Sequence, residues 1–122
     1  MVTDAFCAYA IAQVVVAQAF WAQLHTGDPG PNGLFAGSVD QTRQQILWGT
    51  IDGCRAYSSN TLRWDEVSGV PGFPQNISHL SLWSGPQGGL CWATTRLVPL
   101  RVPHKATLEI PPGITLDLSP VT

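Results

Sequence analysis

The sequence predicts a mainly β protein: an antiparallel β-sandwich or jelly roll with an N-terminal α-helix. Two observations predict this fold. Beyond residue 40, short segments of alternating apolar and polar residues follow one another along the chain. Turn-forming residues separate them, and the 122 residues include ten prolines and twelve glycines. A chain of this length predicts a single domain over residues 1–122, with the helix in 1–17 and the strands in 19–119.

The helix is predicted within the most apolar stretch of the chain, AFCAYAIAQVVVAQAFWAQL at residues 5–24. We expect it to run from about Asp4 to Val16, with Thr3 or Asp4 as its N-cap. Its surface is apolar nearly all round, so we expect it to pack on more than one side, one of them against a neighbouring chain. Length alone would allow a membrane span, but three glutamines and many alanines disfavour insertion. No cationic segment precedes the stretch, so we expect no secretory signal.

A strand is expected next, over residues 19–26, with Phe20, Ala22 and Leu24 on one face. It ends at LHTGDPGPNG, where prolines and glycines exclude helix and strand in turn. We therefore expect a loop from there to about Asp40.

The remaining strands follow at short intervals. An Asp-Gly pair at 52–53 predicts a hairpin turn. In the last segment Ile114, Leu116 and Leu118 alternate with polar residues and are expected on one face. The expected strands are 42–48, 54–58, 60–67, 76–83, 90–98, 106–110 and 114–119.

Charge is scarce, and this limits the classes of partner. Charged residues make up 11% of the chain and the net charge is −2, whereas about 25% is typical of soluble domains. The lysines and arginines are scattered, so we expect no nucleic-acid partner. The nearest approach to a basic patch, RVPHK at 101–105, is interpreted as a solvated loop. A surface with little charge repels its own copies weakly, which favours assembly.

No group of residues has the spacing that catalysis or metal binding needs, so we expect no enzyme, no cofactor and no metal. His25, His79 and His104 have no ligand-spaced neighbour in the sequence; a metal site formed in space by His25, His79 and a cysteine is the alternative. Asp28 and Asp40 are too few for a usual calcium loop and are interpreted as residues of capped turns.

The three cysteines are Cys7, Cys54 and Cys91. An odd number without C-x-x-C spacing argues against a disulfide framework and against a thiolate zinc site. Cys7 and Cys91 lie in apolar patterns and are interpreted as small buried hydrophobic residues. A single disulfide between Cys54 and Cys91 is the alternative.

All five tryptophans lie within expected strands. Burial in a core or in a subunit contact is the commoner use of such an indole, and stacking of sugars on exposed indoles is the alternative. Four tryptophans and three apolar residues of the helix are our candidates for an interface: Phe6, Tyr9, Val14, Trp21, Trp48, Trp83 and Trp92.

Four motifs occur in order along the chain: AQLHTGDPGPNG, TRQQILWG, ISHLSLWSGPQGG and TLEIPPGITLDLS. In this order they resemble small virion structural proteins of tailed phages that infect actinobacteria, proteins described as minor tail, tail-fibre-like or capsid accessory proteins. The resemblance covers residues 19–118, with Arg43 as the family's strand arginine and 110–118 as its closing hairpin. None of these motifs is catalytic.

The resemblance implies a structural protein of the phage particle. We expect a capsid decoration or minor capsid protein on the virion surface, attached to the major capsid protein and assembled as a homo-oligomer such as a trimer. A minor tail or tail-fibre-like protein that contacts tail proteins is one alternative. A module that binds host surface glycans through exposed tryptophans is the other.

Overall fold

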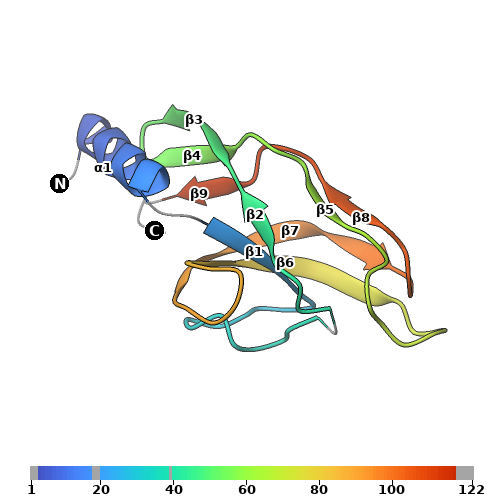
Figure 1. Ribbon diagram of the computed structural model, residues 1–122. Coiled ribbons are helices and arrows are strands. Elements are labelled where there is room, and N and C mark those ends of the chain that lie inside the picture. The colour runs from blue at the N-terminus through green and yellow to red at the C-terminus, as the bar shows by residue number, and fades with distance from the viewer. Residues whose placement is uncertain (1–2, 18–19, 39, 118–122) are drawn as a thin grey trace.

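The computed structural model describes residues 3–17, 20–38 and 40–117, except the side chains of residues 4 and 14–17. These residues form a helix and nine strands (Figure 1), which confirms the prediction of a mainly β fold with an N-terminal helix. The elements are α1 (Asp4–Ala17), β1 (Phe20–His25), β2 (Gln44–Ile46), β3 (Trp48–Asp52), β4 (Arg55–Ser58), β5 (Leu62–Trp64), β6 (Gln75–Trp83), β7 (Cys91–Val102), β8 (Leu108–Ile110) and β9 (Thr115–Asp117).

The strands form three antiparallel sheets in a sandwich-like arrangement. The largest sheet, in the order β2-β1-β6-β7, runs along most of the molecule (Figure 1). Two small sheets, β3-β4-β9 and β5-β8, face it; the first lies toward α1 and the second toward the other end.

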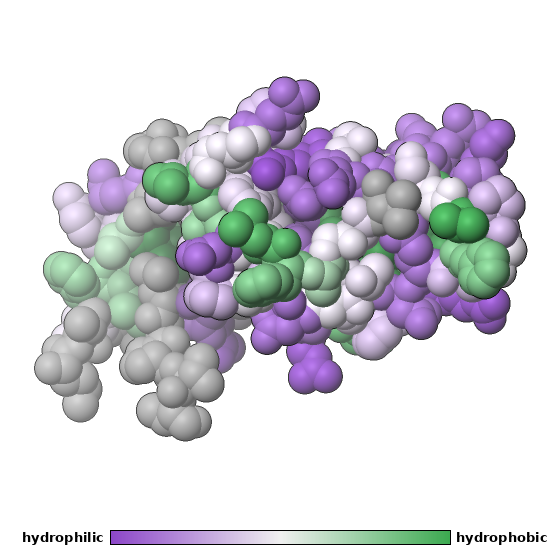
Figure 2. Space-filling model, turned by 90° about the horizontal axis from the view of Figure 1, so that it is seen from below, coloured by the Kyte–Doolittle hydropathy of each residue, from purple (hydrophilic) through white to green (hydrophobic). Residues whose placement is uncertain are grey.

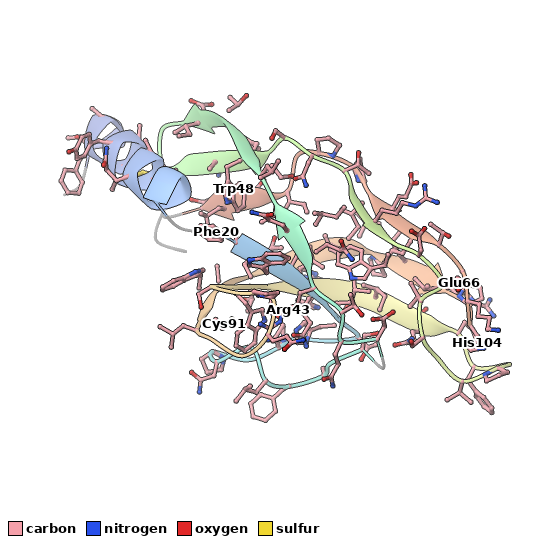
Figure 3. The ribbon with its side chains drawn as sticks, in the orientation of Figure 1. Phe20, Arg43, Trp48, Glu66, Cys91 and His104 are labelled. Carbon is pink, nitrogen blue, oxygen red and sulfur yellow. A yellow bond between two sulfur atoms is a disulfide. The ribbon has the colours of Figure 1, made fainter. Side chains whose placement is uncertain are left out.

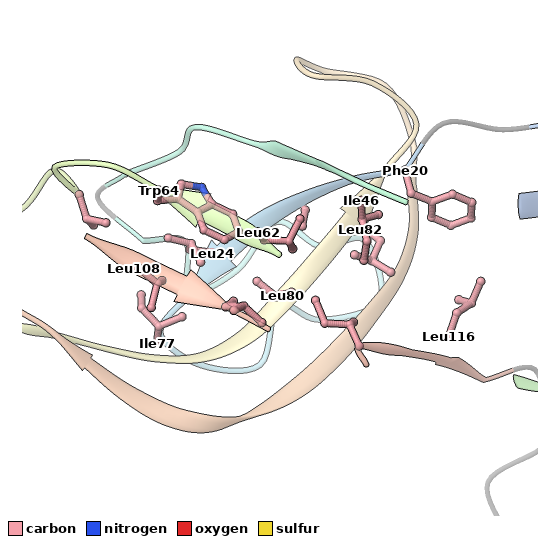
Figure 4. Close-up of a cluster of buried hydrophobic side chains, with 14 of the residues drawn as sticks. Phe20, Leu24, Ile46, Leu62, Trp64, Ile77, Leu80, Leu82, Leu108 and Leu116 are labelled. Atoms are coloured by element: carbon pink, nitrogen blue, oxygen red, sulfur yellow. The ribbon is translucent and has the colours of Figure 1, made fainter. Parts of the chain in front are cut away.

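One apolar cluster fills the space between the sheets (Figure 4). In β1, Phe20, Ala22 and Leu24 are each at most 2% exposed, so the predicted alternation is confirmed. Trp64 contributes the largest fully buried side chain from the small sheets. Its indole Nε1 donates a hydrogen bond to the Thr42 carbonyl at 2.8 Å, so this buried polar atom is satisfied.

Helix α1 packs at one end of the sandwich, against β3 and β4 (Figure 1). The backbone N–H of Phe6 donates to Thr3 Oγ1 at 3.3 Å, so Thr3 is the N-cap, one of the two residues predicted for this position. Ile11 is fully buried in the core, whereas Phe6 and Tyr9 are 61% and 65% exposed. The helix is therefore packed on one side within the single chain, and part of its apolar surface faces outward.

A disulfide joins Cys7 of α1 to Cys54 in the β3–β4 turn, 47 residues further along the chain. The sequence interpretation was wrong here: Cys7 is bonded, and the partner of Cys54 is Cys7, not Cys91. Cys91 is a free thiol. The reason is spatial, because α1 lies against the β3–β4 hairpin and so brings Cys7 to the turn.

The segment predicted as one strand over 42–48 is divided between two sheets. The chain leaves the large sheet after β2 and enters a small one with β3, and Leu47 lies between them. The predicted hairpin turn at 52–53 is confirmed, since Asp52 pairs with Arg55 and Gly53 has a φ of 58°.

The closing hairpin implied by the resemblance does not form. β8 pairs with β5 and β9 pairs with β4, so the two segments belong to different sheets. The Pro111-Pro112-Gly113 segment between them carries the chain from one small sheet to the other. Ile114 and Leu116 are both buried, as the alternation predicted, and Leu118 lies outside the described residues.

RVPHK is only partly a loop. Strand β7 continues through Arg101 to Val102, and the turn is confined to residues 103–105. The bonding between β6 and β7 extends to the pair Gln75 and Val102, which explains the longer strand.

Candidate functional site

The segment between β1 and β2, described at residues 26–38 and 40–43, folds over the outer face of the large sheet, and we call it the covering loop. It returns beside β1, because the N–H of Ser38 donates to the Leu24 carbonyl at 3.1 Å. Asp28 accepts a hydrogen bond from the N–H of Gly30 at 2.9 Å, which makes a local turn. The residues that were predicted to end the strand therefore form a folded cover.

A buried set of polar groups, the His25 network, joins this loop to the sheet. Nδ1 of His25 lies 2.8 Å from the Phe35 carbonyl oxygen, and Nε2 lies 2.6 Å from Ser81 Oγ. Trp83 Nε1 donates to the same Ser81 oxygen at 2.6 Å. A carbonyl only accepts, so Nδ1 carries the proton and Nε2 accepts the Ser81 hydroxyl hydrogen. Each polar atom of the network thus has a partner.

A serine beside a histidine is also the arrangement of a nucleophile and its base. Here Ser81 and His25 have no exposed area, and the serine oxygen already accepts the indole N–H of Trp83. A substrate cannot reach Ser81 in this conformation. We therefore interpret the His25 network as the attachment of the covering loop to the sheet.

Burial makes the network sensitive to pH. It lowers the pKa of His25 below its ordinary value of 6.5, and this effect outweighs the hydrogen bonds to backbone carbonyls that raise it; the nearby His79 lowers it further. The unfolded chain therefore binds a proton at His25 more readily than the folded chain. The contribution of His25 to the free energy of unfolding is therefore complete above about pH 6.5. It declines as the pH falls from there toward the lower pKa of His25 in the folded chain.

Unfolding by urea at several pH values tests this. In the wild type, His25 is expected to contribute a decline of at most about 1.4 kcal/mol per pH unit below about pH 6.5. His25→Gln removes this contribution, so its curve is flatter over the same range. Identical slopes for the wild type and His25→Gln contradict the assignment.

Arg43 connects the end of the covering loop to the β6–β7 turn. Its Cζ lies 4.2 Å from the centroid of the Trp83 ring, a cation–π contact (Figure 3 labels Arg43). Nε donates to Gln23 Oε1 at 2.9 Å, and Nη1 donates to the carbonyl oxygens of Gly85 and Gly88 at 2.9 and 2.8 Å. The arginine of the family resemblance thus orders a loop.

The two aspartates considered for calcium are used as caps. Asp28 holds its turn as described, and Asp40 accepts the N–H of Thr42 and of Ser68, both at 3.0 Å. His25 and His79 are cross-strand neighbours, but both ring nitrogens of His25 are engaged. Within the described residues, no three His, Cys, Asp or Glu side chains come together in a way that could hold a metal ion.

The free thiol of Cys91 lies under the covering loop. A Cβ atom placed on Gly33 would come within 2.6 Å of its sulfur, so only glycine allows this approach. Burial raises the pKa of the Cys91 thiol, which lowers the fraction of reactive thiolate. Cys91 is therefore a packing residue in this conformation.

The candidate interface residues fall into three groups. Phe6, Tyr9 and Trp92 are 61%, 65% and 42% exposed, so their side chains reach solvent. Trp21 and Trp48 are half-buried, and Trp48 packs edge-on against Phe20 with ring centroids 5.3 Å apart.

Trp83 forms the third group, since it is 6% exposed and lies beneath Arg43. The side chain of Val14 lies outside the described residues.

Several exposed apolar residues were missed because they lie in segments assigned to loops or turns. Leu34 and Phe35 in the covering loop are 72% and 66% exposed, and Phe73 is 70% exposed. Figure 2 shows hydrophobic side chains in separate groups on the face seen from below. Turn-forming residues directly before Leu34 (Asn32-Gly33) and before Phe73 (Pro71-Gly72) were the available signal, because no strand is expected to bury an apolar residue there.

Fold and surface together define a small antiparallel β-sandwich in which the His25 network attaches the covering loop and several apolar side chains reach solvent. Within the described residues, no helix has the length and hydrophobicity to cross a membrane. In comparisons with known proteins, no family model matches this chain and no curated protein matches its sequence. The resemblance to phage virion proteins therefore stays a prediction.

Proposed function

We propose that this protein is a structural component of a tailed-phage particle, a capsid decoration or minor capsid protein that assembles with its own copies on the shell. The observation that carries the proposal is the exposure of large apolar side chains at several separate places on a weakly charged sandwich. Phe6 and Tyr9 lie on α1, Leu34 and Phe35 on the covering loop, and Phe73 at the other end of the molecule.

The size of the molecule is compatible with several neighbours. A standard interface takes about 800 Å² from each partner, whereas the total accessible surface is 7309 Å². Burying apolar surface stabilises association by about 25 cal/mol per Å², before the costs of association are subtracted. With a net charge of only −2, electrostatic repulsion between copies is small.

The position of the chain in purified particles tests the proposal. Heads and tails are separated, and the chain is quantified in each by mass spectrometry. Recovery with DNA-filled heads is the expected result. Recovery with tails alone rejects the capsid assignment and supports a minor tail or tail-fibre-like protein, and absence from both fractions rejects a virion role.

A glycan-binding module is a second candidate, and the exposure of Trp92 favours it. At 42% this indole is the most exposed of the five, and its strand neighbour Thr94 is also exposed. Titration of tryptophan fluorescence with host cell-wall polysaccharides tests the idea, with Trp92→Ala as the matched control. If the fluorescence does not change at millimolar sugar concentration, glycan binding is rejected.

A further inference from the structure

A short apolar turn projects from the end of the molecule away from α1, in the connection between β5 and β6 (Figure 1). We call Val70-Pro71-Gly72-Phe73 the apolar tip. The N–H of Phe73 donates to the Val70 carbonyl at 2.9 Å, and Gly72 has a φ of 82°. With proline before glycine, this is a type II turn, in which only glycine adopts the required φ without strain. Val70 and Phe73 are 52% and 70% exposed.

The base of the apolar tip is fixed by hydrogen bonds. The N–H of Val67 donates to the Ala106 carbonyl at 2.9 Å, and the N–H of Lys105 donates to the Val67 carbonyl at 3.0 Å. Gln75 Nε2 donates to the Ser68 carbonyl at 2.7 Å. An exposed aromatic residue on such a preorganised turn loses little conformational freedom when it binds.

A pocket of about 420 Å³ lies elsewhere on the surface, between the middle of β7 and the β8–β9 connection. We call it the β7 pocket. Ile77 pairs with Leu100 and His79 pairs with Arg96, so β7 has extra residues there and bulges away from β6. Most side chains that line the pocket are apolar, among them Leu97, Val98, Leu100, Ile110, Pro111 and Ile114.

The apolar tip and the β7 pocket match in size and chemistry. A phenyl ring occupies a cavity on the order of 150 Å³, so the pocket of about 420 Å³ has room for the Phe73 ring and part of its turn. The Phe35 ring, in contrast, packs against its own chain, since a Cβ atom added at Gly30 would lie 2.6 Å from it.

We infer that the apolar tip of one copy inserts into the β7 pocket of a second copy. The two surfaces are different, so the contact is head-to-tail, and repetition of it generates a ring or a filament. This deepens the proposed function, on which it rests, because it names the contact through which copies assemble.

Sedimentation equilibrium of the wild type and two surface variants tests the contact. Phe73→Ser removes the tip, and Val98→Lys places a charge at the pocket; both residues are largely exposed, at 70% and 83%, so the fold is retained and is checked by circular dichroism. The wild type is expected to self-associate, and each variant alone to associate roughly thirtyfold more weakly or worse. Phe35→Ser, at 66% exposed, is the matched control and behaves like the wild type.

Mixing the two variants separates this contact from a symmetric one. Phe73→Ser keeps an intact pocket and Val98→Lys keeps an intact tip, so the mixture is expected to form a one-to-one complex and nothing larger. A wild type that stays monomeric at millimolar concentration, a mixture that stays dissociated, or an equal loss in Phe35→Ser overturns the inference. The particle experiment is independent of this one. If the chain is found in heads but Phe73→Ser associates like the wild type, only this contact is rejected. If Phe73→Ser weakens association but the chain is absent from particles, only the virion role is rejected.

Discussion

A Cys54→Ser variant is expected to lose roughly 3–4 kcal/mol of unfolding free energy relative to the oxidised wild type. The bond joins residues 47 positions apart, so its loss restores conformational entropy to a long segment of the unfolded chain. Ile11 is the fully buried side chain that attaches α1 to the core. Urea unfolding followed by circular dichroism, without reductant, measures the difference.

Cys91→Ser is the matched control, because Cys91 is the unbonded cysteine and only half-buried. Its loss of unfolding free energy is expected to stay below about 1 kcal/mol. Thiol titration of the denatured chain gives a second readout: one thiol without reductant and three after reduction. Three thiols without reductant, or equal stabilities of Cys54→Ser and the wild type, contradict the assigned bond.

Trp64→Ala is expected to cost about 3–5 kcal/mol of unfolding free energy. The side chain is 1% exposed within the core, and its removal leaves a cavity between the large sheet and the β5–β8 sheet. It also removes the hydrogen bond to the Thr42 carbonyl, near the end of the covering loop. Since small domains are stable by only about 5–15 kcal/mol, the variant is expected to unfold at much lower urea concentration.

Two further variants divide this loss into parts. Trp64→Phe keeps most of the apolar volume but leaves the Thr42 carbonyl without its donor, so we expect a smaller loss of about 1–3 kcal/mol. Trp92→Ala removes an indole that is 42% exposed and is expected to cost less than Trp64→Phe. Equal losses for Trp64→Ala and Trp92→Ala mean that Trp64 does not anchor the core as described. Circular dichroism is the suitable signal, because each change removes a fluorophore.

The sequence predicted those features that depend on neighbouring residues. The alternation of Phe20, Ala22 and Leu24 identified the buried face of β1, and Thr3, the N-cap, is one of the two residues predicted for that position. The Asp-Gly pair located the β3–β4 turn. In each case one local rule of periodicity, capping or turn geometry decides the conformation.

Features that join distant segments were not predictable in the same way. Cys7 and Cys54 are brought together by the packing of α1 on a hairpin, and an odd number of cysteines favoured the wrong interpretation. The hydrogen bond between His25 and Ser81 spans 56 residues, and the periodicity of neither strand indicates it. Proline and glycine after β8 signalled a turn, but a turn does not specify the sheet that the next strand joins.

The candidate surfaces show the same limit. Aromatic residues in strands were the natural choice from sequence, yet Trp83 lies beneath Arg43. Phe73 is more exposed than the described tryptophans, and it lies in a turn that is closed by the hydrogen bond from its own N–H to the Val70 carbonyl. The exposure of a side chain depends on which distant segments pack over it, and only the folded structure determines this.

The placement of α1 beside β3 and β4 has a practical consequence for imaging. The first helix and the last strand lie at one end of the molecule, and the apolar tip lies at the other (Figure 1). A fluorescent or electron-dense tag on either side of the described segment would thus stand away from Phe73. Tagged copies in an assembly would then report which way each subunit points.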